Sequence, residues 1–311
     1  MQATEPQEPA EPGAPRPGGA DAAAIRTPGH PGYPDVAVRR ARLAVLACFL
    51  VQGASFAVLV TRVPAIQDRY GLGDGALTVV LSLVPIVAGL GSVLAERLVA
   101  RHGSPRVLWT AQPVVCVSAI GVGAGDRLWQ LAVVVCVFAL ALGAVDATMN
   151  MQAVGIQARQ GRSVMNGFHA SWSLGGIAGA GLATLADHQD VALVVMYLVS
   201  AGVTAPVALL AGRHYLPTAS PAATAGADRP GIPWRVILPL CAVMAFVYIG
   251  DSAVSSWGAV YAEKVQDMDD NTALPYLVYM ITALVGRGLG DLGVRRWGAL
   301  PVVRAGSLTA A

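Results

Sequence analysis

The chain has 311 residues, of which 55% are hydrophobic and only 13% are charged, whereas soluble domains carry about a quarter charged residues. This imbalance indicates that lipid surrounds most of the chain. The formal net charge is only +2 and the arginines are scattered between apolar runs, which argues against a nucleic-acid partner.

The opening stretch, residues 1–38, is rich in Pro, Ala, Gly and Glu. It contains no long apolar run of the kind that forms the centre of a cleaved signal peptide. Such a composition cannot bury enough apolar surface to fold. We therefore expect a disordered cytoplasmic tail.

Apolar segments of membrane-spanning length follow the tail. A spanning helix needs about 20 mostly apolar residues, because a rise of 1.5 Å per residue must cross about 30 Å of hydrocarbon. Eight segments reach that length, and a ninth begins near Pro301 and continues to Ala311. The expected spans are 41–63, 76–98, 107–125, 128–154, 163–186, 191–212, 234–262 and 272–290.

The connections between spans are short, except for residues 214–233, which are rich in Pro, Ala and Thr. This composition is typical of a linker between two bundles, and we expect it to be cytoplasmic. It separates a six-helix N-terminal bundle at 39–213 from a partial C-terminal bundle at 234–311, which would hold the seventh and eighth spans and the start of the ninth.

The charges of the short loops predict the orientation, because basic loops resist translocation. Acidic residues dominate the loops after spans five and seven, for example Asp187 and Asp190. We therefore expect a multi-pass protein of the plasma (inner) membrane with a cytoplasmic N-terminus. The basic residues of the alternate loops are Arg39, Arg40, Arg42, Arg97, Arg101, Arg106, Arg159, Arg162, Arg213, Arg229 and Arg235.

An internal repeat predicts the architecture. Residues 91–103 and 286–298 share the pattern G-x-x-L-x-[ED]-x-x-V-x-R-x-G, and the two copies lie six predicted spans apart. This interval predicts an all-α polytopic bundle with two six-helix halves in parallel relation. Because twelve spans need about 400 residues, we expect the second half to be incomplete, with the chain ending before its last helices.

Several short motifs resemble the major facilitator superfamily. The loop 96–106 reads ERLVARHGSPR, in which Arg101 and Gly103 match the R-x-G of the superfamily's hallmark loop. RVP at 62–64, DATMNMQ at 146–152 and FHASWSLGG at 168–176 are similar to the sugar-permease-like branch related to fucose transporters. The resemblance implies two six-helix bundles and a proton-coupling acid in the fourth span, at Asp146.

Asp146 is the clearest ionisable residue within a span, where a charge costs at least about 2.5 kcal/mol and usually faces a cavity or a partner. Asn150 lies four residues on, so acid and amide share one helix face. Burial disfavours the charged form of a carboxylate, so Asp146 could take a proton from one side and release it to the other. The alternative is a structural carboxylate paired with another helix.

The fifth span carries a second polar stripe, formed by Asn166, His169 and Ser173. His169 could relay protons, or its hydrogen bonds could fasten helices together. Trp172 could stack on the apolar face of a sugar, or it could belong to the core or the interfacial belt. Gln52 in the first span could likewise bind a hydroxylated solute or form an interhelical hydrogen bond.

Asp251 is the second acid within a span and lies in the seventh, with Trp257 nearby. It could line the cavity from the second half, form an external gate or serve as a structural partner. Charged residues at the cytoplasmic ends of the two repeats could instead form ion pairs that gate the opposite side; the alternative is that the arginines fix topology and contact lipid headgroups. These cytoplasmic gate candidates are Glu96, Arg101, Arg287, Asp291 and Arg296.

The remaining motifs do not indicate an enzyme. Gly288, Gly290 and Gly293 spell G-x-G-x-x-G but follow a membrane helix, where a dinucleotide site needs a strand. The four cysteines lack metal-ligand spacing, and we expect no cofactor or metal.

The sequence therefore predicts a secondary active transporter of a small polar solute, for example a sugar, working as a proton symporter by alternating access. The alternatives are an efflux carrier for amphipathic compounds and a non-transporting receptor or inactive transporter-like protein. Its partners would be the solute, protons and the lipid bilayer; the sequence makes no prediction of the oligomeric state.

Overall fold

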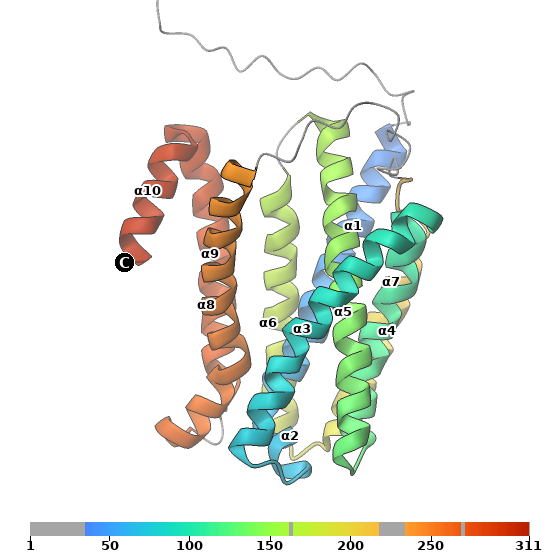
Figure 1. The fold of residues 1–311 in the computed structure, drawn as a ribbon, viewed down its shortest axis with the longest axis vertical. Helices are drawn as coiled ribbons and strands as arrows, with labels where there is room; N and C mark the ends of the chain where they lie inside the picture. Colours follow the sequence, from blue (N-terminus) through green and yellow to red (C-terminus); the bar gives the residue numbers. More distant parts are fainter. Residues whose placement is uncertain (1–34, 162–163, 218–233, 269–270, 311) are drawn as a thin grey trace, which may run out of the picture. The chain divides into compact units, whose positions relative to one another are not determined.

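The computed structural model describes residues 35–161, 164–217, 234–268 and 271–310 (Figure 1). The predicted tail at 1–38 and linker at 214–233 lie mostly outside these residues. The described part is all-α, as predicted, and contains no strand. Its helices are α1 (Asp35–Val60), α2 (Val63–Arg69), α3 (Asp74–His102), α4 (Ser104–Ala124), α5 (Leu128–Gln160), α6 (Met165–His188), α7 (Leu193–Gly212), α8 (Trp234–Gln266), α9 (Leu274–Trp297) and α10 (Ala299–Ala310).

Each expected span corresponds to one long helix, α1 or α3 to α9, and α10 begins where the ninth was expected. The short helix α2 was not expected. Pro64 lies in its first turn, where the missing N–H of proline costs nothing. Within the described residues, seven helices are long and apolar enough to cross a membrane, and α6 is not among them.

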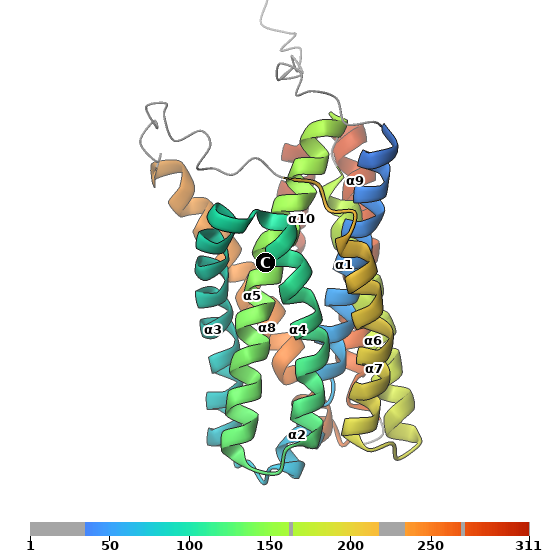
Figure 2. The same ribbon diagram turned by 90° about the vertical axis from the view of Figure 1, so that its right-hand side faces the viewer.

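The low hydropathy of α6 has a packing reason. Its glycines let its backbone approach α1 closely, which is how small residues hold helices together in membranes. A Cβ added to Gly175 would overlap the carbonyl oxygen of Leu50, and one added to Gly53 of α1 would overlap that of Trp172. Helices α1 and α6 therefore pack closely against one another (Figures 1 and 2).

Helices α3 and α5 form a second close pair by the same device. A Cβ on Gly91 would overlap the carbonyl oxygen of Leu140, and one on Gly143 would overlap that of Ala88. The main chains thus touch at two levels, which fixes how α3 and α5 face one another.

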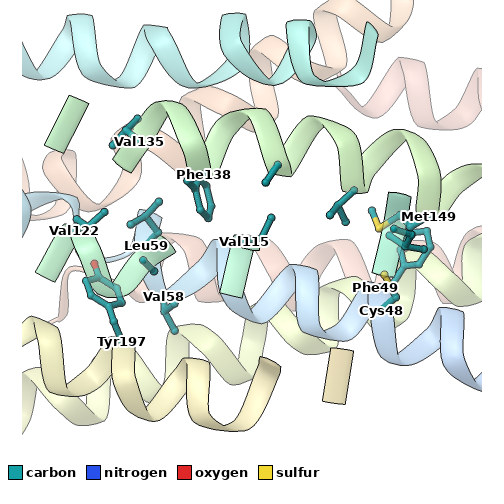
Figure 3. Packing of buried hydrophobic residues seen from close by; sticks show 14 of the residues in the cluster. Cys48, Phe49, Val58, Leu59, Val115, Val122, Val135, Phe138, Met149 and Tyr197 are labelled. Atoms are coloured by element: carbon teal, nitrogen blue, oxygen red, sulfur yellow. The ribbon is translucent and has the colours of Figure 1, made fainter. Parts of the chain in front are cut away.

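Large apolar side chains fill the space among α1, α4, α5 and α7, as Figure 3 shows for Phe49, Phe138, Met149 and Tyr197. The segment after α7 is held to this core by Gln152 of α5. Its Nε2 donates to the carbonyl oxygen of Leu216 over 2.8 Å, and its Oε1 accepts from the Leu216 N–H over 3.2 Å.

Helix α9 packs against α6. Tyr276 and Met280 are buried against Ala57 and Ala180, and Gly176 leaves room for the Met280 sulfur. In contrast, α8 exposes large apolar side chains, including Leu238, Phe246 and Ile249. A contiguous apolar surface of this kind is rare on water-soluble proteins and suits contact with lipid or another apolar surface.

Candidate binding cavity

A cavity of about 650 Å³ lies among α1 to α6, α8 and α9, a size typical of small-molecule sites. Its two sides differ in chemistry. The apolar wall comprises Leu77, Val80, Leu81 and Val84 of α3 with Val135, Phe138 and Leu142 of α5. The polar side chains of the opposite wall are His169 and Trp172 of α6, Tyr248, Asp251, Ser252, Ser255 and Ser256 of α8, and Tyr279 and Arg287 of α9; we call them the polar wall, and Met244 and Val247 of α8 also line the cavity.

Asp146 lines the cavity from α5, beside the apolar wall, and is half-buried. The Asn150 amide donates to the Asp146 backbone carbonyl over 2.9 Å and to its carboxylate Oδ1 over 3.4 Å. No ion pair joins Asp146 to a basic residue in the described part of the chain. The carboxylate therefore faces the cavity with the neutral Asn150 amide of its own helix as its hydrogen-bond partner.

Asp251 and Arg287 bring opposite charges to the polar wall. The Tyr279 hydroxyl donates to Asp251 Oδ1 over 2.6 Å, which links α9 to α8. Arg287 Nη1 donates to the His169 carbonyl oxygen over 2.8 Å and also to Ser173 Oγ, which links α9 to α6. Asp251 lies near the middle of α8, which continues to Gln266.

The other predicted cavity residues of α1 and α6 combine a cavity position with packing. Gln52 lines the cavity and accepts a hydrogen bond from Gln112 of α4 over 3.3 Å. The His169 ring lies edge-on to Phe49 at 5.3 Å between centroids. Trp172 lies under the Arg287 guanidinium, 5.9 Å from the ring centroid. The transport and fastening interpretations of these residues are therefore compatible.

Four predicted residues do not line the cavity: Asn150, Asn166, Ser173 and Trp257. Asn150 and Ser173 lie directly behind the lining and bond to Asp146 and Arg287 respectively. Trp257 is 38% exposed in α8. Asn150 and Ser173 therefore contact charged groups of the site.

The predicted gate residues are dispersed. Glu96 and Arg101 are exposed near the end of α3, and the Arg296 guanidinium lies 5.6 Å from the ring centroid of Trp297. Arg287 lies in the cavity instead of with these residues. The Asp291 side chain lies outside the described residues, so the gate stays a prediction.

Four further residues that line the cavity were not predicted from the sequence: Tyr248, Ser252, Ser256 and Tyr279. A mid-span acid such as Asp251 calls for a donor on a neighbouring helix, and Tyr279 supplies it. The need for such a donor could be inferred from the sequence, but which residue supplies it depends on how α9 is rotated against α8.

The end of the bundle that carries α2, at the bottom of Figure 1, holds further contacts of α8, and of the turn before α9, with the first part of the chain. Lys264 Nζ lies 2.7 Å from Asp74 Oδ1, which also accepts from Gln67 over 3.1 Å. Thr272 Oγ1 donates to the Thr61 carbonyl oxygen over 3.5 Å. We call this set the α2-side contacts.

The same end is also fastened within the first six helices. Arg62 of the RVP motif forms an ion pair with Asp187, which lies in the last turn of α6. The Tyr70 hydroxyl donates to the Val122 carbonyl oxygen over 2.7 Å. Burial raises the pKa of the Tyr70 phenol, which favours the protonated form that donates this bond. In the described residues, no group of three or more His, Cys, Asp or Glu is arranged to hold a metal ion.

The long apolar helices and the cavity with few charges define a multi-pass membrane protein of the transporter class. The family model of the Major Facilitator Superfamily matches residues 6–311, and the chain belongs to that superfamily. It is 26% identical over 271 residues to an uncharacterized transporter of Sinorhizobium fredii, covering 86% of this chain and 71% of the relative. It is 28% identical over 273 residues to an uncharacterized MFS-type transporter of Yersinia pestis, covering 85% and 68%.

These comparisons support a membrane transporter that moves a small solute. Neither relative's name specifies a solute or a coupling ion. The likeness to the fucose-permease-like branch therefore stays a prediction.

Proposed function

We propose that the protein is a proton-coupled secondary transporter of a small solute in the plasma membrane, working by alternating access. One observation carries the proposal: Asp146 faces the cavity without an ion-pair partner among the described residues. An intramembrane carboxylate in this position marks a proton or solute pathway more often than a structural contact.

The coupling step follows from the cost of a buried charge. When the cavity is closed to water, the ionised Asp146 carboxylate is destabilised, so the closed state favours the protonated form. When the cavity opens, water stabilises the carboxylate and the proton can leave. A proton would thus cross together with the solute, in the direction set by the two gradients. His169, which lines the same cavity, is a candidate relay.

Alternating access requires the contacts between the two halves to break in turn. The α2-side contacts join α8 and the turn before α9 to the first part of the chain at one end, and Arg287 joins α9 to α6 at mid-depth. By the charge distribution of the loops, the α2 end would face outward. Opening toward the outside would then require Lys264 and Asp74 to separate.

The polar wall suits a solute with hydroxyl or charged groups, and a sugar could stack on Trp172. A second candidate function is the efflux of amphipathic compounds, which is favoured by the apolar wall. A solute panel of monosaccharides and amphipathic compounds, tested for flux into vesicles, separates the two. Binding of a solute without flux in sealed vesicles would instead favour a receptor.

The proposal is tested by reconstituting the wild type and Asp146→Asn into vesicles with an imposed pH gradient. We expect the wild type to accumulate solute against its gradient. The variant should still exchange solute at equal concentrations but should not accumulate it, because its amide cannot carry a proton. Asp126→Asn, which alters an exposed acid in a loop, is the control. Gradient-driven accumulation by Asp146→Asn at the wild-type level would contradict the coupling role.

A further inference from the structure

Two opposite charges face the same cavity without pairing with one another. Asp251 of α8 and Arg287 of α9 both belong to the polar wall, and no ion pair joins them in the part of the chain that the structure describes. Each is held by other partners: Asp251 by the Tyr279 hydroxyl, and Arg287 by Ser173 and the His169 carbonyl. These partners hold both groups in place.

Both groups keep hydrogen-bonding capacity. A guanidinium has five N–H donors, and the bonds of Arg287 to α6 use Nη1. A carboxylate can accept about four hydrogen bonds, and the Tyr279 bond uses one of the Asp251 oxygens. In a low-dielectric site, incompletely paired charges are costly. A ligand that forms hydrogen bonds with both Arg287 and Asp251 would therefore bind much more tightly than one that reaches neither.

A ligand with a single charge can form an ion pair with only one of the two groups. An organic anion on Arg287 would leave its charge close to Asp251, and an organic cation on Asp251 would be repelled by Arg287. A ligand that carries both charges on neighbouring atoms meets both groups at once. Because the protein groups are already held apart, binding does not have to break an existing ion pair.

The apolar wall limits what the rest of the ligand can be. A polyol has hydroxyl groups on all sides, and those facing Val84, Phe138 and Leu142 would find no partner and would lose their hydrogen bonds to water. A hydrocarbon body would instead gain from burial there. The two walls therefore suit a polar head on one side and an apolar body on the other.

We infer that the cavity binds a zwitterionic solute with an apolar body, whose carboxylate lies on Arg287 and whose ammonium lies on Asp251. Amino acids with hydrocarbon or aromatic side chains are the simplest members of this class. The inference deepens the proposed function and rests on it, because it identifies the solute that the transporter would carry.

The test measures equilibrium binding to the purified protein by titration calorimetry. The probes are L-leucine and L-phenylalanine, the amide of each, which keeps only the positive charge, and the N-acetyl form of each, which keeps only the negative charge. Glucose serves as the polyol. We expect at least one of the two amino acids to bind about tenfold or more tightly than either of its one-charge forms and than glucose.

Two variants should then give a crossed pattern. Asp251→Asn should abolish the preference for the amino acid over its N-acetyl form, because the ammonium loses its partner. Arg287→Gln should abolish the preference for the amino acid over its amide, because the carboxylate loses its partner. Arg304→Gln, at an exposed arginine of α10, should keep both preferences. Thermal unfolding of each variant establishes that it is folded before binding is compared.

The inference is wrong if neither amino acid binds more tightly than its one-charge forms, or if both variants weaken all probes equally. Its failure is separable from that of the proposed function. Proton-driven accumulation of glucose without amino-acid binding would overturn the inference alone. The crossed binding pattern, together with unimpaired accumulation by Asp146→Asn, would support the inference and overturn the coupling role of Asp146.

Discussion

The two walls of the cavity are built by different means. The apolar wall belongs to α3 and α5, whose main chains touch through Gly91 and Gly143, and the charge beside it is that of Asp146. The polar wall belongs to α6, α8 and α9, which are joined through hydrogen bonds of Asp251 and Arg287. The comparison separates the proposed proton site from the proposed head-group site: they lie on different helices and, in the predicted architecture, in different halves.

The largest effect is expected where the apolar wall depends on main-chain contact. Gly143→Ala would place a Cβ onto the Ala88 carbonyl oxygen, and since backbone cannot move aside, α3 and α5 must separate. We expect a loss of about 3 kcal/mol in unfolding free energy, seen as a lower thermal unfolding temperature in detergent.

Gly89→Ala is the matched control, because nothing lies within 4 Å of a Cβ added there. Replacing this helix-interior glycine should leave stability equal or raise it by up to about 1 kcal/mol. Equal unfolding temperatures for the two variants would mean that the close approach of α3 and α5 does not support the wall.

A smaller effect is expected on the polar wall. Tyr279→Phe removes the hydroxyl that donates to Asp251, and hydrogen bonds to charged groups contribute about 1.5–3 kcal/mol. We expect a fall in unfolding temperature that corresponds to about 2 kcal/mol. A free Asp251 should also bind the amino-acid probe less tightly, because the carboxylate is no longer held in place.

Tyr276→Phe provides the comparison for Tyr279, three residues away on the same helix. The buried Tyr276 hydroxyl has no hydrogen-bond partner among the described residues, so its removal should not destabilise the protein and could stabilise it. If the two variants behaved alike, the bond between α8 and α9 would not hold the polar wall.

The smallest effect is expected at the ion pair that joins the two walls. The Lys264 and Asp74 side chains are 43% and 80% exposed, and exposed pairs contribute at most about 1 kcal/mol. Lys264→Met should change the unfolding temperature little. It should nevertheless raise the labelling rate of a cysteine introduced at Ser256, because the α2 end opens more often; an unchanged rate would separate this ion pair from gating.

The sequence was sufficient for the spans and for the rare charges. Hydropathy located the helices, and the cost of intramembrane charge selected Asp146 and Asp251, both of which line the cavity. The helix α2 was missed because seven residues are too few for a periodic pattern, although Pro64 marks its start.

The partners of those charges could not be derived from the sequence. Arg287 was expected near Arg296 at the end of the helix, since sequence spacing places them on one element, but the rotation of α9 directs its guanidinium to Ser173 of α6. Likewise, the pairing of Asp251 with Tyr279 depends on how α8 and α9 pack. Such contacts are set by tertiary packing and leave no period in the sequence.

Proton movement that accompanies solute entry tests the central claim most directly. In lightly buffered vesicles that contain the wild type, addition of the transported solute should raise the external pH, because each solute molecule that enters brings a proton with it. Asp146→Asn should exchange labelled solute without any pH change. The same pH change in both proteins would contradict the account, because the proton would then be carried by a group other than Asp146.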